Sequence, residues 1–238
     1  MTILAHLKEM WGRAKARLAS YTLVFLLAAT ASAANTEISN VILLVDEGGR
    51  SSFTVTNQSQ SVTTYELTAY DWRVRNGKDA YEQTSEFVAI PPAFSLNPGA
   101  SRVVRVGFRD PRPQPIERTF RLSVREVPDE TGADGVSFAF EHMLAVYVEP
   151  AGGREPAQLA WSMQQLDAQW FVRVENNGNS RAVLERVSLD GDPIDLSSTR
   201  TILPRTWRQY NLPQSIAASA EVLRFDLKDG TSGQVTLR

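Results

Sequence analysis

The stretch "GVSFAFEHMLAVYVEP", residues 135–150, decides the fold class because it predicts one long, apolar β-strand. A typical strand has about five or six residues, and this alternating run is roughly twice as long. Side chains two residues apart share one face of a strand, and one face here carries Val136, Phe138, Phe140, Leu144, Val146 and Val148. One small domain rarely needs such a strand, so we expect part of it to be surplus to the fold.

The rest of the chain after residue 34 alternates between runs rich in Val, Thr, Phe and Leu and turn sequences such as "RNGKD" and "NPGA". Turns about eight to twelve residues apart are typical of antiparallel β-sandwiches. The Pro- and Gly-rich segment "EPAGGREPA", residues 149–157, separates two series of such runs. We therefore predict an all-β protein with domains at residues 34–151 and 152–238. A single large β-domain is the alternative.

Residues 1–33 are predicted to be a signal peptide. A basic segment precedes the short apolar run "YTLVFLLAA", residues 21–29, and "ASA" supplies the small residues of a cleavage site before Ala34. This run is shorter than the roughly 20 residues that span a bilayer. We expect an exported chain that begins at Ala34, and a retained membrane anchor is the alternative.

Composition argues against several kinds of chemistry. The chain has no cysteine, and His142 is the only histidine after residue 33, so thiol chemistry, a histidine-based triad and histidine metal sites are not expected. A net charge of −2 gives no reason to expect nucleic acid as a partner. Carboxylate pairs have no local motif, so a glycan-processing enzyme stays open as an alternative.

"IERTFRLSVREVP", residues 116–128, resembles the signature strand of the PapD-like periplasmic pilus chaperones of the chaperone–usher pathway. The matching residues are Glu117, Phe120, Leu122, Val124, Arg125, Glu126, Val127 and Pro128. The segments "SFTVTN", "LNPGASRVVRVGFR" and "VENNGN" add to the resemblance. "YDWRVRNGKD" is closer to the archaic, Csu-like branch.

The resemblance implies two immunoglobulin-like β-sandwich domains in a boomerang arrangement and a chaperone of the periplasm that is not an enzyme. Such a chaperone lends a strand to pilus subunits that lack their own last strand, and delivers them to an outer-membrane usher. No cofactor, metal or nucleic acid is implied. The matching donor residues here are Val136, Phe138 and Phe140. An immunoglobulin-like structural or adhesive surface protein, or a pilus component, is the alternative.

Three positions depart from the family pattern. Many members hold the subunit's terminal carboxylate with an Arg and a Lys, and the matching residues here are Ile42 and Ala145. Glu117 matches an acid whose usual basic partner is replaced by Glu149. We therefore expect carboxylate anchoring to be absent, weakened or moved to another basic residue, for which the candidates are Arg121, Arg125 and Arg173.

Overall fold

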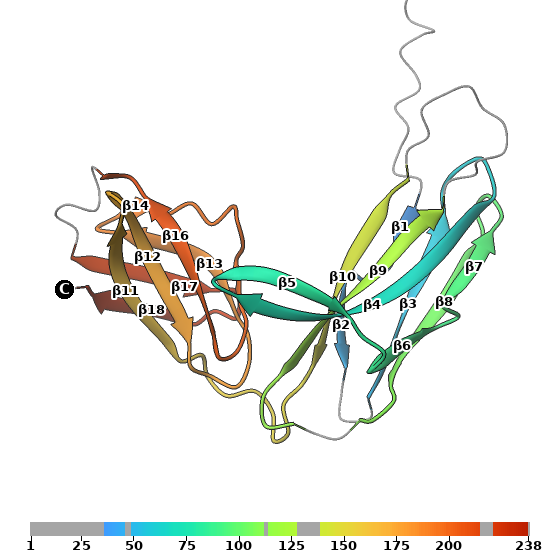
Figure 1. The fold of residues 1–238 in the computed structure, drawn as a ribbon, viewed down its shortest axis with the longest axis horizontal. Coiled ribbons are helices and arrows are strands. Elements are labelled where there is room, and N and C mark those ends of the chain that lie inside the picture. Colours follow the sequence, from blue (N-terminus) through green and yellow to red (C-terminus); the bar gives the residue numbers. More distant parts are fainter. Residues whose placement is uncertain (1–35, 46–48, 112–113, 128–138, 215–220, 238) are drawn as a thin grey trace, which may run out of the picture.

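The computed structural model describes residues 36–45, 49–111, 114–127, 139–214 and 221–237. All eighteen elements with bounds in this part of the chain are β-strands, so the predicted all-β fold is confirmed. They form two bodies that stand apart above their connection in Figure 1. Within the described residues no helix has the length and hydrophobicity needed to cross a membrane.

The first body contains two sheets. One has the order β1-β3-β8-β6, made of β1 (Thr36–Ile38), β3 (Arg50–Asn57), β8 (Ser101–Phe108) and β6 (Phe87–Ile90). The other has the order β2-β10-β9-β4-β5, with β7 also paired to β4. Its strands are β2 (Ile42–Val45), β10 (Glu141–Val148), β9 (Arg118–Val127), β4 (Thr63–Arg75), β5 (Lys78–Gln83) and β7 (Ala93–Leu96).

The segment "FVAIPPAFSL" changes sheets at its two prolines. Proline has no N–H to give to a sheet ladder, and Pro91 and Pro92 separate β6 from β7. Strand β6 pairs with β8 in one sheet, whereas β7 pairs with β4 in the other. The chain thereby closes a corner of the sandwich around a core that includes Phe53, Phe87, Val104, Phe120 and Leu144.

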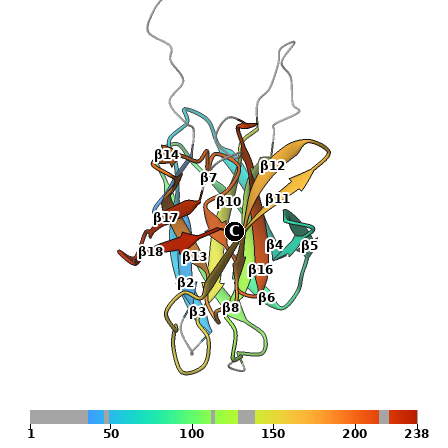
Figure 2. The same ribbon diagram turned by 90° about the vertical axis from the view of Figure 1, so that its left-hand side faces the viewer.

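The second body repeats this two-layer plan, as the end-on view in Figure 2 shows. One layer has the order β11-β12-β16, made of β11 (Leu159–Leu166), β12 (Gln169–Asn176) and β16 (Thr206–Leu212). The other has the order β14-β13-β17-β18, with β15 paired to β13. Its strands are β14 (Asp192–Pro193), β13 (Ala182–Leu189), β17 (Val222–Leu227), β18 (Ser232–Thr236) and β15 (Thr201–Ile202).

The hairpin of β4 and β5 reaches from the first body to the second (Figure 1). Asn76 and Gly77 form its tip, and both have positive φ, at 50° and 72°, which suits a tight hairpin turn. Arg208 of β16 donates to the Gly77 carbonyl at 2.9 Å and forms an ion pair with Asp79. A small apolar cluster lies between the bodies, in which Leu203 packs with Trp72, Ala145 and Tyr147. These contacts fix the two bodies beside a common cleft.

Candidate functional site

Among the described residues, strand β10 has a free edge over its first half. It pairs with β9 along its whole length, but with β2 only from Ala145 onward. The Ala145 N–H donates to the Val41 carbonyl at 3.0 Å. Since backbone groups alternate sides along a strand, the N–H groups of Met143 and Glu141 point toward the same side. In the described part of the chain no strand pairs with them there, so this edge is open to a further strand.

The inward face of β10 continues past the core. Leu144 and Val146 are almost completely buried, whereas Phe140, on the same side of the chain, is 46% exposed. The candidate donor residue Phe140 is therefore apolar surface that the first body does not cover. The other two, Val136 and Phe138, lie outside the described residues.

The outer face of the same sheet carries a row that includes both substituted positions. Ala145 stands opposite Ile42 on one side and opposite Arg121 on the other. The Arg121 guanidinium lies 3.8 Å from the centre of the Trp72 ring. Its Nε is buried and has no hydrogen-bond partner among the described residues. Arg121 thus places a cation one strand inward from Ala145.

The other two candidate arginines lie elsewhere. Arg125 is exposed and forms an ion pair with Glu66 on β4. Arg173 lies 4.1 Å from the centre of the Trp207 ring and 3.7 Å from Glu175, within the second body. Of the three, only Arg121 shares a row with Ile42 and Ala145.

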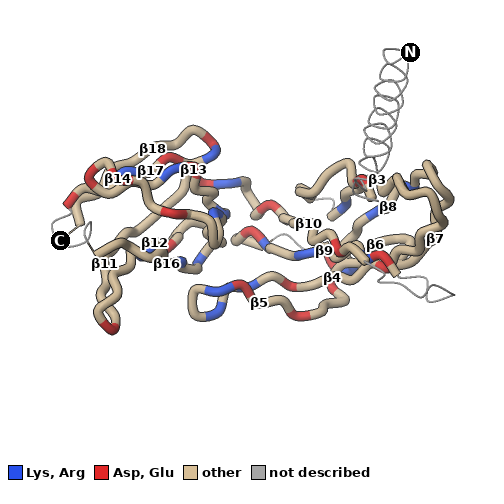
Figure 3. Tube along the Cα trace, turned by 90° about the horizontal axis from the view of Figure 1, so that it is seen from above, with Lys and Arg blue, Asp and Glu red and all other residues tan. Residues whose placement is uncertain are grey.

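A cavity of about 280 Å³ lies in the cleft between the bodies. Ile42 and Tyr147 line it from the first body, and three basic residues line it from the second: Arg154, Arg181 and Lys228. Figure 3 shows basic residues on the edge of the second body that faces the first. Sequence reasoning missed these three cations, because nothing in their local sequence connects them with Ile42.

Arg181 also supplies the counter-ion that Glu117 was expected to lack. Its guanidinium and its backbone N–H both donate to the Glu117 carboxylate, the latter at 3.0 Å. The guanidinium lies 3.6 Å from the centre of the Tyr147 ring. Glu149, at the family's usual partner position, is exposed. Burial raises the pKa of Glu117, and the charge of Arg181 opposes that rise.

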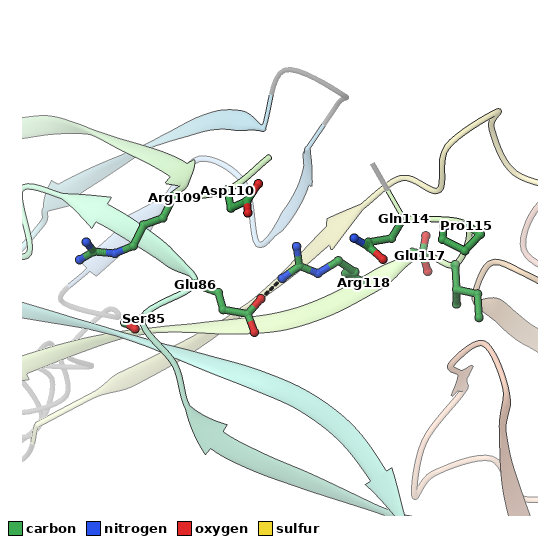
Figure 4. Close-up of a pocket in the computed structure, with 9 residues that line it drawn as sticks. Ser85, Glu86, Arg109, Asp110, Gln114, Pro115, Glu117 and Arg118 are labelled. Carbon is green, nitrogen blue, oxygen red and sulfur yellow. Dashed lines mark hydrogen bonds and ion pairs between the residues drawn. The ribbon is translucent and has the colours of Figure 1, made fainter. Parts of the chain in front are cut away.

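Another hollow, in the first body, is lined in part by Glu86, Arg109, Asp110 and Arg118 (Figure 4). Arg118 forms an ion pair with Glu86. Its guanidinium also lies 5.3 Å and 5.0 Å from the centres of the Phe108 and Phe120 rings. Burial lowers the pKa of Arg118. The ion pair joins the start of β9 to the residue before β6, which is a structural arrangement.

Metal chemistry finds no support in the part of the chain that is described. No group of three or more His, Cys, Asp or Glu residues there is arranged to hold a metal ion. Of the described tryptophans, the two most buried are core residues: Trp161 belongs to the second core and Trp72 to the cluster between the bodies.

Comparison with known proteins gives one family match. Residues 35–154 match the family described as pili and flagellar-assembly chaperone, PapD N-terminal domain. No curated protein matches the chain by sequence.

Solved structures share the fold at low sequence identity. The chain is similar to one in the CsuC–CsuE chaperone–tip adhesion subunit complex of archaic Csu pili from Acinetobacter baumannii. The TM-score is 0.69 at 18% identity, covering 86% of this chain and 98% of that one. The Salmonella enterica SafA pilin–SafB chaperone complex gives a TM-score of 0.63 at 14% identity, with 87% and 99% covered. The Pseudomonas aeruginosa CupB2 chaperone gives 0.56 at 17% identity, with 85% and 100% covered.

Proposed function

Because this chain belongs to the pili and flagellar-assembly chaperone family, we propose that it stabilises pilus subunits in the periplasm by lending them a strand and then delivers them to an outer-membrane usher. Members of this family are chaperones of pilus assembly and not enzymes. The family match confirms the predicted relationship, and the Csu complex among the similar structures agrees with the predicted archaic branch. The two-domain all-β fold is shared with these chaperones.

The open edge of β10 is the observation that carries the proposal. A partner strand can pair with the unoccupied N–H and C=O groups before Ala145, as in other cases of strand addition. Main-chain hydrogen bonds then give affinity, while alternate side chains enter pockets of the partner. Phe140 directly precedes β10 on the same side of the chain as Leu144 and is 46% exposed, so its ring is available to such a pocket.

A positive charge one strand inward from β10 supports an anchor for the subunit's terminal carboxylate. Arg121 is our first candidate, because it lies in the row of Ile42 and Ala145 and keeps a buried Nε without a partner in the described residues. A guanidinium binds a carboxylate with charge-assisted hydrogen bonds. Arg154 and Lys228 in the cleft are the second source of charge. Arg181 is already engaged by Glu117.

Co-expression with pilus subunits encoded beside this gene tests the proposal. The chaperone carries an affinity tag, and the subunit recovered with it from periplasmic extract is quantified. We expect wild-type protein to recover subunit and Phe140→Asp to recover much less, because a carboxylate in an apolar pocket is costly.

Val103→Asp is the matched control. Val103 is a strand residue that is 56% exposed, on β8 in the other sheet. Equal loss in both variants would contradict strand lending by β10. Unchanged recovery with Phe140→Asp would contradict it as well.

A further inference from the structure

The pairing of β9 with the chain changes one residue before β10 begins, at Phe140 and Glu126. Glu126 N–H donates to the Phe140 carbonyl at 2.9 Å. In a regular hydrogen-bonded pair, the Phe140 N–H would donate to the backbone carbonyl of Glu126 in return. It donates instead to the side-chain Oε2 of Glu126, at 3.4 Å. One glutamate therefore holds both backbone groups of Phe140, with its own backbone and with its side chain.

The Glu126 carboxylate is itself held in place. Glu126 is only 5% exposed, and a buried carboxylate is costly unless it accepts hydrogen bonds. The Thr36 hydroxyl donates to Oε1, and the same hydroxyl oxygen lies 3.1 Å from that of Tyr65. Thr36 belongs to β1 in one sheet, whereas Tyr65 on β4 stands opposite Glu126 in the other. Both sheets thus fix the direction of this carboxylate.

The position at which Phe140 is held matters for function, because a lent strand has to pair with its partner in one register. A slip of one residue turns every side chain of a strand to the other face. A lent strand therefore has to enter its partner in a fixed register. The backbone groups of Phe140 face β9, and the next residue, Glu141, is the first of β10 whose N–H points to the open edge. Whatever fixes Phe140 also fixes which alternate side chains face the partner.

We propose that Glu126 is a positioning residue for strand lending: its carboxylate takes the place of the backbone carbonyl in the ladder and sets the register in which β10 meets a subunit. The inference rests on the proposed function and names a residue that acts on it through Phe140. A purely structural role, in which Glu126 only joins the two sheets through Thr36, is the competing account.

Three variants separate these two accounts. Thr36→Val removes the hydroxyl that joins the sheets and leaves the hydrogen bond that the Phe140 N–H donates to the Glu126 carboxylate. Glu126→Met fills similar space but accepts no strong hydrogen bond, so it loses both contacts. Glu126→Gln keeps both, since its amide oxygen can accept from Phe140 while its NH₂ group donates to Thr36.

The test combines amide hydrogen exchange of the free protein by NMR with subunit recovery in the co-expression assay. In Glu126→Met we expect the Phe140 amide to exchange about five to ten times faster, the factor for losing one net hydrogen bond. The Leu144 amide serves as an internal reference for general loosening. Thr36→Val and Glu126→Gln should keep the wild-type rate at Phe140, and only Glu126→Met should lose subunit.

Each outcome decides a different point. Equal Phe140 exchange in Glu126→Met and Thr36→Val would overturn the positioning role, and so would faster exchange with undiminished subunit recovery. Failure of the wild-type protein to recover any subunit would instead refute the proposed function, while the exchange rates would still report how Glu126 holds Phe140.

Discussion

Removing the Arg181 guanidinium should destabilise the protein, because Arg181 forms a buried ion pair with Glu117 between the two bodies. In Arg181→Met, Glu117 loses the guanidinium that forms an ion pair with it. The side chain of Glu117 is 0% exposed and that of Arg181 is 9% exposed, so water cannot replace the lost partner. Breaking one partner of a buried pair typically costs about 3–5 kcal/mol. We expect the free energy of unfolding, measured by urea denaturation at pH 7.5, to be lower than that of the wild type by about this amount.

The loss of stability in Arg181→Met should be smaller at low pH than at neutral pH. Burial raises the pKa of Glu117 above its ordinary value of 4.5. The folded state then binds the proton more tightly than the unfolded state. The stability that this group contributes is therefore present below pH 4.5 and is lost as the pH rises through the pKa of Glu117 in the folded state. Without Arg181 that pKa rises further. The difference between wild type and Arg181→Met should therefore be smaller at pH 5 than at pH 7.5.

Arg186→Met is the control, because Arg186 pairs with Asp226 while its side chain is 78% exposed. Exposed pairs contribute little, so this variant should unfold like wild type. A loss below about 1 kcal/mol in Arg181→Met, or a loss equal to that of Arg186→Met, would refute the reasoning.

Three further predictions concern the hairpin, the anchor and the leader. Gly77→Ala should destabilise the protein more than Gly99→Ala. Both glycines have a φ of 72°, but only at Gly77 would an added Cβ meet the Trp207 ring, at 2.5 Å. Equal losses of stability in urea denaturation would contradict this contact. Arg121→Met should weaken binding of a subunit with a free terminal carboxylate by about 1.5–3 kcal/mol, and calorimetry should find no further loss when that carboxylate is amidated. N-terminal sequencing of exported protein should begin "ANTEIS", and a chain retaining residues 21–29 would contradict cleavage before Ala34.

Local sequence patterns predicted the fold well because strands and turns have local causes. The period-2 runs and the turn residues gave the all-β class, and the two prolines of "FVAIPPAFSL" marked the break between β6 and β7. The sequence predicted one long strand over residues 136–148. The structure has β10 at Glu141–Val148, and residues 136–138 lie outside the described structure. The domain boundary near residue 152 stays a prediction.

The site was harder to predict because its contacts join distant parts of the chain. Arg181 pairs with Glu117 across 64 positions and between the two bodies, so no local pattern pointed to it. Arg121 was one of three candidates, and only the strand register placed it beside Ala145. The proposed role of Glu126 could not be predicted, because the signature motif identifies the residue but does not show that its carboxylate points to Phe140. Val136, Phe138 and Phe140 remain a prediction as donor residues.

The central claim is that a subunit adds a strand to the open edge of β10, and amide exchange at Glu141 and Met143 tests it most directly. Their N–H groups point to that edge, before the point at which β2 begins to pair. We expect both amides to exchange rapidly in the free chaperone and at least about a hundredfold more slowly in a purified chaperone–subunit complex, as for amides newly paired in a sheet. Amides that stay rapidly exchanging in a stable complex would contradict strand lending.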